Sequence, residues 1–97
     1  MTGTVRTVVV AYDIVSDSRR EDVATLLSGY GPRVQLSVFE CQVDGRRGLR
    51  ELCAQLRRTV DIETDQVRLY PLDRGKDQNR VIIGARQVEE RQDFWIV

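Results

Sequence analysis

Asp13 is the residue whose type and position best suit it for chemistry. It stands near the end of the β-branched run at residues 5–14, just before a segment rich in helix-capping residues. Open α/β sheets place ligand-binding groups at such a boundary between strand and helix. Mg²⁺ needs only one or two carboxylates, with water and substrate phosphate as its other ligands. Two Asp13 carboxylates related by a dimer axis would supply that site; the alternative is an Asp that only caps a turn.

Arginine dominates the basic residues of this chain, and guanidinium groups pair well with phosphate. Of the 15 basic residues only Lys76 is a lysine, which fits a phosphate-binding protein or simply a GC-rich genome. Arg19 and Arg20 fall in the first turn of the first expected helix, beside backbone N–H groups that could bind a phosphate. A second set, at positions 46, 47, 50, 57 and 58, could follow a nucleic-acid backbone, or be a solvated helix face interrupted by Glu51.

Composition excludes several classes of function. The chain has 97 residues, no His and two Cys, so it holds neither a Ser-His or Cys-His nucleophile system nor a His-containing zinc site. Cys41 and Cys53 form no CxxC motif or disulfide framework, which predicts a cytoplasmic protein with reduced, buried thiols. The net charge of zero argues against bulk electrostatic capture of nucleic acid. We expect neither a signal peptide at residues 1–4 nor a membrane span, since no apolar run approaches the ~20 residues that a span needs.

Hydrophobic periodicity predicts the elements that must position Asp13. Residues 5–14 indicate a central strand covered on both faces. Ser18 and Glu21 fit a capping box, and Gly31, in a left-handed conformation before Pro32, is expected to end the helix. The apolar stripe of this helix is Val23, Leu26, Leu27 and Tyr30.

The second extended segment, residues 33–43, changes the phase of its apolar alternation near Ser37. A strand has a fixed period of two, so we expect a bulge, a kink or a tight hairpin there. Asp44 and Gly45 precede a second helix with the stripe Leu49, Leu52, Cys53, Leu56 and Val60. A strand at 66–72, which Pro71 would push toward a sheet edge, and short strands at 81–83 and 94–97 complete the chain.

If the phase break is a hairpin, this order is that of an α+β, ferredoxin-like β-α-β-β-α-β sandwich with an extra C-terminal strand. We expect a single domain over residues 1–97, with a core at 5–72 and tail strands in 73–97. Both helices would cover the same face of the sheet. The bare face and the apolar ending at 94–97 predict a homodimer.

Four parts of the sequence form a specific combination: residues 10–14, Arg19 with Arg20, the run 30–41, which contains the segment RVQLSVFE, and residues 66–72. Together they resemble the CRISPR-associated Cas2 family. The resemblance implies a ferredoxin-like homodimer in which Asp13 of both subunits holds Mg²⁺, with Mn²⁺ as an alternative. It also implies a metal-dependent endonuclease that cleaves the phosphodiester backbone of single-stranded RNA or duplex DNA.

Carried over by position, the resemblance implies a catalytic set of Asp13, Tyr12, Arg20, Arg33 and Phe39, with Asp13 as the metal ligand. Arg19, Arg20 and Arg33 would bind nucleic acid. Asp22 departs from the pattern, since many relatives carry a basic residue there. From the residues alone, Tyr12 and Phe39 could equally be core aromatics, and Arg33 could pair with a surface acid.

The family's other role is that of a non-catalytic scaffold, which bridges subunits of the CRISPR integrase during spacer acquisition. This role is our alternative to the nuclease. A ferredoxin-like RNA-binding or small-ligand regulatory module is a weaker third interpretation, because the strands carry no aromatic stacking motif.

Overall fold

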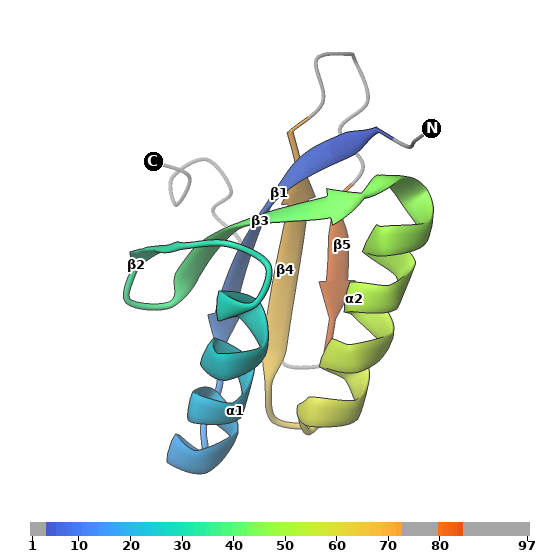
Figure 1. Cartoon of the computed structure of the whole chain (residues 1–97). Coiled ribbons are helices and arrows are strands. Elements are labelled where there is room, and N and C mark those ends of the chain that lie inside the picture. The colour runs from blue at the N-terminus through green and yellow to red at the C-terminus, as the bar shows by residue number, and fades with distance from the viewer. Residues whose placement is uncertain (1–3, 73–79, 85–97) are drawn as a thin grey trace.

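The computed structural model describes residues 4–72 and 80–84 of the chain. Its elements are β1 (Val5–Asp13), α1 (Asp17–Ser28), β2 (Arg33–Gln35), β3 (Val38–Asp44), α2 (Gly45–Thr59), β4 (Gln66–Pro71) and β5 (Val81–Ile83). The strands form one antiparallel sheet in the order β2-β3-β1-β4-β5 (Figure 1). This arrangement confirms the predicted ferredoxin-like α+β fold, with β5 as the additional strand. The apolar run at 94–97 lies outside the described residues.

The first strand organises the sheet, because β1 pairs with β3 on one side and with β4 on the other. Val8, Val10 and Tyr12 point into the core, whereas Val9 and Ala11 between them remain partly exposed. Coverage is confirmed for one face of the strand and stays a prediction for the other. The β-branched run forms a central strand, but the described elements cover only one of its faces.

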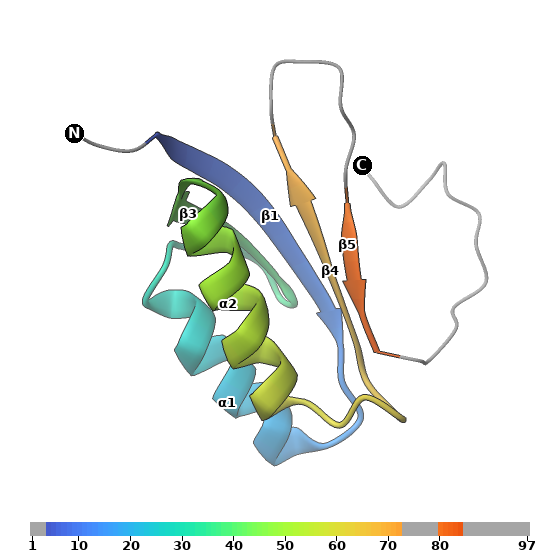
Figure 2. The same cartoon turned by 90° about the vertical axis from the view of Figure 1, so that its right-hand side faces the viewer.

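Both helices pack against the same face of the sheet (Figure 2). α1 buries Val23 and Leu27, as its predicted stripe requires. α2 buries Leu52, Cys53 and Leu56. These side chains meet the buried row of the sheet, which includes Val8, Val10, Phe39, Cys41, Val67 and Leu69. The opposite face has no helix over it among the described residues.

The first helix begins two residues earlier than the capping-box prediction placed it. Ser16 is the N-cap, and its Oγ accepts a hydrogen bond from the backbone N–H of Arg19 at 3.2 Å. Ser18 instead lies inside the helix, so the predicted capping box with Glu21 does not form. The reason is local: Ser16 still has an extended backbone, as an N-cap residue should, and the helix follows it directly.

The phase break near Ser37 is a tight hairpin that also contains a bulge. Arg33 pairs with Phe39 while Gln35 pairs with Val38, so one extra residue of β2 is accommodated between the two pairs. The turn is anchored to the central strand, because the carbonyl oxygen of Ser37 accepts a hydrogen bond from the backbone N–H of Tyr12 at 3.1 Å. The hairpin therefore lies beside the end of β1.

β4 lies inside the sheet, so the expectation that Pro71 would make it an edge strand is wrong. β4 pairs with β1 on one side and with β5 on the other. The pairing with β5 stops at Leu69, opposite Val81. Pro71 lies two residues beyond that point, where its missing N–H removes none of the described β4–β5 pairs.

Gly31 is required by a close approach of two backbone segments. It does not adopt a left-handed conformation, contrary to the prediction: the positive-φ glycines among the described residues are Gly45 and Gly84. A Cβ on Gly31 would lie only 2.0 Å from the carbonyl oxygen of Glu40 in β3. The chain therefore needs glycine here to pass from α1 into the hairpin.

Gly31→Ala should destabilise the protein by about 1–3 kcal/mol, because the backbone of β3 must move away from the new methyl group. Gly29→Ala is the matched control, since its new Cβ would meet nothing closer than 3.5 Å and its φ of −78° suits alanine. Urea unfolding midpoints measure both effects. Equal midpoints for the two variants would contradict the close approach.

Candidate active site

An open cleft of about 500 Å³ lies where the end of β1, the start of α1 and the β2–β3 hairpin meet. It is lined by Tyr12, Asp13, Ile14, Arg20, Glu21, Ala24, Arg33, Leu36 and Ser37. The structure thus brings together four residues of the predicted catalytic set, from three separate elements. Asp13 is exposed at the last position of β1, where its carboxylate is accessible to a ligand.

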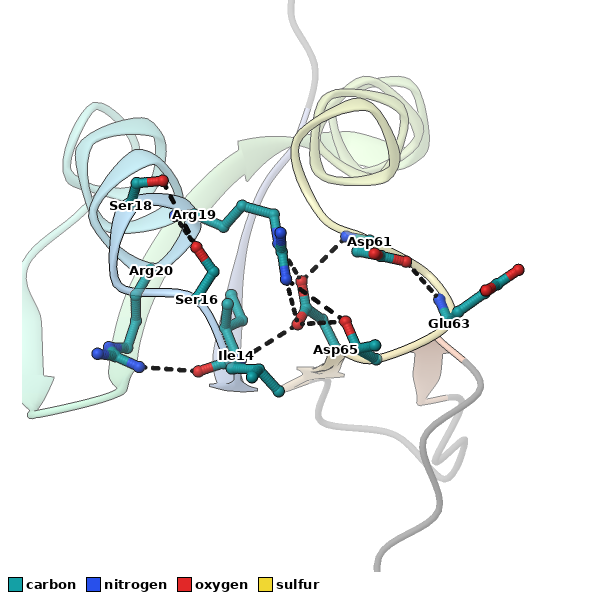
Figure 3. Close-up of polar contacts among 10 residues, drawn as sticks. Ile14, Ser16, Ser18, Arg19, Arg20, Asp61, Glu63 and Asp65 are labelled. Carbon is teal, nitrogen blue, oxygen red and sulfur yellow. Dashed lines mark hydrogen bonds and ion pairs between the residues drawn. The ribbon is translucent and has the colours of Figure 1, made fainter.

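Arg20 lies next to the end of β1. Its Nη1 donates a hydrogen bond to the carbonyl oxygen of Ile14 at 2.9 Å (Figure 3), and its Nη2 forms an ion pair with Asp17. The carbonyl contact holds the guanidinium beside the residue that follows Asp13. The side chain is still 41% exposed, so its positive charge can act on a ligand in the cleft.

Arg33 is supported by two stacked aromatic rings. Its guanidinium carbon lies 5.2 Å from the centroid of the Phe39 ring, which is close enough for a cation–π interaction. Phe39 in turn stacks on Tyr12, with 6.3 Å between the ring centroids. Both aromatics are core residues, with exposed fractions of 2% and 7%. Their burial favours a supporting role, and direct catalytic roles for Tyr12 and Phe39 stay predictions.

Arg19 points away from the cleft. Its Nε donates to Oδ2 of Asp65 at 2.7 Å, whereas Arg20 leaves α1 in a different direction, toward Ile14 (Figure 3). Its Nη2 also contacts Oδ1 of Asp65 at 3.3 Å, so the pairing is bidentate. Nucleic-acid binding by Arg19 stays a prediction, and the guanidinium is already occupied by this carboxylate.

Asp65 joins segments that lie far apart in the sequence, and sequence reasoning missed it. Its carboxylate is fully buried and accepts hydrogen bonds from the backbone N–H groups of Val15, at 3.2 Å, and Asp61, at 2.9 Å, as well as from Arg19. Burial alone would raise the pKa of Asp65, but these hydrogen bonds, with one from Thr64, lower that pKa to about 2. Because Val15 is only two residues beyond Asp13, Asp65 holds the exit of β1 in place.

The cleft could hold a divalent metal ion through few protein ligands. Among the described residues no group of three or more Asp, Glu, Cys or His side chains is close enough to form a metal site. Asp13 and Glu21 are nevertheless exposed carboxylates on the wall of the same cleft, and carboxylate oxygen suits Mg²⁺. Sequence analysis had no reason to select Glu21, since an acid in the first turns of a helix also stabilises the helix dipole.

The two cysteines are buried hydrophobic residues, as predicted. Burial raises the pKa of the Cys41 thiol to about 11, and it also raises that of Cys53. Neither thiol is therefore an activated nucleophile at neutral pH.

Within residues 4–72 and 80–84, no helix has both the length and the apolar character that crossing a membrane requires.

The chain is thus a ferredoxin-like domain with an exposed Asp at the end of its first strand and two arginines on the wall of the adjoining cleft. Its sequence matches the profile of the CRISPR associated protein Cas2 family over residues 6–80. The chain therefore belongs to the Cas2 family, as its resemblance predicted.

Individual relatives support this assignment. The chain is 47% identical over 76 residues to the CRISPR-associated endoribonuclease Cas2 3 of Chloroflexus aurantiacus, covering 78% of this chain and 81% of that protein. It is 52% identical over 63 residues to the CRISPR-associated endonuclease Cas2 2 of Thermus thermophilus, covering 65% of this chain and 69% of that one. The crystal structure of Streptococcus pyogenes Cas2 at pH 6.5 matches with a TM-score of 0.63 and 36% identity, over 69% of this chain and 86% of the other.

Asp65→Asn should destabilise the protein by about 3 kcal/mol, because it leaves the hydrogen-bond donors around a buried carboxylate poorly matched. The contribution of Asp65 has a defined pH dependence. Its pKa is lower in the folded protein than its ordinary value of 3.8, so the stabilisation is present above pH 4 and is lost as the pH falls toward 2.

Denaturation at several pH values measures this effect, with Asp17→Asn as the control. Asp17 is 92% exposed and pairs with Arg20 at the surface, so its replacement should change stability by less than about 1 kcal/mol. If Asp65→Asn loses as much stability between pH 4 and pH 2 as the wild type does, Asp65 is not the titrating group.

Proposed function

We propose that this protein is a metal-dependent endonuclease, which hydrolyses phosphodiester bonds of RNA or DNA at the cleft around Asp13. The observation that carries the proposal is the placement of an exposed Asp13 in the same cleft as Arg20 and Arg33. A nuclease needs this pairing of a metal-binding carboxylate with cations that stabilise negative charge on phosphate. The relatives' names, endoribonuclease and endonuclease, support the same class of reaction.

Each residue of the cleft has a distinct part in this proposal. Asp13 holds Mg²⁺, or Mn²⁺ as the alternative, and the ion when bound would shield the phosphate charge and polarise the scissile bond. Arg20, fixed by the carbonyl of Ile14, binds a phosphate oxygen from the α1 side. Arg33, held over Phe39, does so from the hairpin side. The two guanidiniums offset the negative charge that develops during hydrolysis.

A homodimer would complete this site. One chain supplies few carboxylates to the cleft, and a second copy would supply a second Asp13. The face of the sheet opposite the helices offers a surface for the pairing, because partly exposed apolar residues such as Val9, Ala11 and Val38 lie on it. Burying apolar area of this kind stabilises an interface between subunits.

Membership of the Cas2 family supports a place in CRISPR spacer acquisition, in the cytoplasm and together with the CRISPR integrase. The alternative function is a non-catalytic dimer that holds duplex DNA between integrase subunits. One observation favours this scaffold: the guanidiniums of Arg20 and Arg33 on the cleft wall can bind a DNA backbone without a metal ion.

Asp13→Asn should reduce metal-dependent cleavage at least about 100-fold, because the neutral amide is a poor Mg²⁺ ligand. The assay compares single-stranded RNA with duplex DNA, each in magnesium, manganese and EDTA. Asp22→Asn is the matched control, since Asp22 is an exposed acid of α1 that does not line the cleft, and it should keep wild-type activity.

Three outcomes of this assay are informative. Cleavage lost in Asp13→Asn but kept in Asp22→Asn supports the nuclease and identifies its polymer. Full activity in Asp13→Asn refutes the site. No cleavage by the wild type in any condition favours the scaffold, which predicts that Asp13→Asn still supports spacer acquisition when the integrase is present.

The pH dependence of cleavage offers a second test. The chain contains no His, so no imidazole is available as a general base near neutral pH. We therefore expect the cleavage rate to rise toward alkaline pH, as hydroxide becomes more abundant. Initial rates measured from mildly acidic to alkaline pH check this, and a bell-shaped profile centred near pH 6.5 would contradict the proposed site.

A further inference from the structure

The solvent-exposed side of α2 is a row of arginines that the proposed active site does not use. It consists of Arg46, Arg47, Arg50, Arg57 and Arg58, which we call the α2 arginine face. All five are exposed, whereas the buried side of the same helix carries Leu52, Cys53 and Leu56. No residue of α2 lines the cleft around Asp13. The face is therefore separate from the candidate active site.

These five arginines differ from Arg19, Arg20 and Arg68 in having no hydrogen-bond or ion-pair partner among the described residues. None of them makes a side-chain hydrogen bond or an ion pair within the described part of the protein. Arg19 and Arg20, by contrast, are paired with Asp65 and Asp17, and Arg68 donates to Gln66. The α2 arginines thus leave their positive charge available to an external ligand.

The arginines of the first turns work against the stability of the helix, whereas Arg57 and Arg58 in its last turn favour it. Arg46 and Arg47 lie in the first turn of α2, which contains no acid, although the positive end of the helix dipole favours acids there. Arg46 and Arg50 are four residues apart and repel each other, as like charges at this spacing do. A helix face that only contacts solvent would need neither the arginines at the positive end of the dipole nor the like-charge pair. Charges placed at a cost to helix stability are typical of binding surfaces.

Charge is segregated between the two helices, although the whole chain has no net charge. α2 carries five arginines and one acid, Glu51. α1 carries three acids and two arginines, and both of those arginines are paired. The two helices lie next to each other over the sheet (Figure 2), so a polyanion would contact α2 in preference to α1.

We infer that the α2 arginine face binds the sugar–phosphate backbone of double-stranded nucleic acid without reading its sequence. The 15 residues of α2 span about 22 Å, which matches about six base pairs of duplex. The helix contains no aromatic residue on which unpaired bases could stack, and this favours a duplex over a single strand. Guanidinium groups pair directly with phosphate oxygens.

The test is the binding of the full chain to a fluorescently labelled duplex, measured by anisotropy as a function of salt. DNA and RNA duplexes of one sequence form separate arms, and the labelled single strand is the third arm. EDTA is present throughout, so that the result does not depend on cleavage or on Asp13. The wild type should bind at least one of the duplexes more tightly than the single strand.

Arg47→Gln with Arg58→Gln removes two outward-facing charges from the face. We expect the plot of the log of the association constant against the log of the salt concentration to become shallower, its slope losing about 2 in magnitude. Affinity should drop by at least about tenfold at physiological salt. Arg47→Lys with Arg58→Lys keeps both charges and should keep the salt slope. Thr25→Glu with Ser28→Glu makes the same change in net charge on exposed positions of α1, and should weaken binding far less.

Wild-type affinity for duplex in the double Gln variant would overturn the inference. So would a loss of affinity in the α1 variant equal to that in the double Gln variant. Binding of the single strand by the wild type as tightly as the duplex would overturn it as well. Unfolding temperatures separate these results from misfolding, because two exposed arginines that make no hydrogen bond or ion pair with the described residues can be replaced with little change in stability. A protein that binds duplex through α2 but cleaves nothing would disprove the proposed nuclease and leave this inference intact.

Discussion

The hydrogen bonds of the buried Asp65 carboxylate fix the position of the chain where β1 ends and α1 begins. The carboxylate is reached by backbone N–H groups from two different loops and by the guanidinium of Arg19 from α1. A buried carboxylate is stabilised only when such donors surround it. The loop after β1, the loop before β4 and the start of α1 therefore have to meet around Asp65. The end of β5 is also part of this packing, since a Cβ on Gly84 would lie 2.1 Å from the Asp65 carbonyl oxygen.

The cleft follows from this anchor and from the hairpin on its other side. Asp65 holds Val15 on one side of Asp13, and the carbonyl of Ser37 holds Tyr12 on the other. Asp13 is thus presented from a rigid strand end, while Arg20 and Arg33 approach it from a helix and from a hairpin. Functional groups carried by regular elements in this way are placed more accurately than groups on loops.

Local patterns in the sequence were enough to predict the fold and the centre of the candidate site. The alternation of apolar residues located the strands, and the helical stripes correctly identified Val23, Leu27, Leu52 and Leu56 as core. The phase change near Ser37 was detected, but periodicity alone cannot distinguish a bulge from a hairpin, and the structure contains both.

What sequence reasoning missed depends on contacts between distant positions. Asp65 lies 46 residues from Arg19 and 50 residues from Val15, so no local pattern connects them. The role of Gly31 is similar, because the atom that excludes a side chain belongs to Glu40 on another element. Ser16 and Ser18 both have side chains suited to an N-cap, and the sequence pattern does not show that Ser16 has the extended backbone that an N-cap requires.

The bulge in the hairpin has a consequence for how this protein behaves in a crowded solution. β2 forms one edge of the sheet, is only three residues long, and exposes Val34 beside the still more exposed Leu36. A regular apolar edge of this kind would offer a template for strands of other chains. The extra residue interrupts the ladder and increases its twist. An irregularity of this kind disfavours the addition of further strands at this edge, next to the cleft around Asp13.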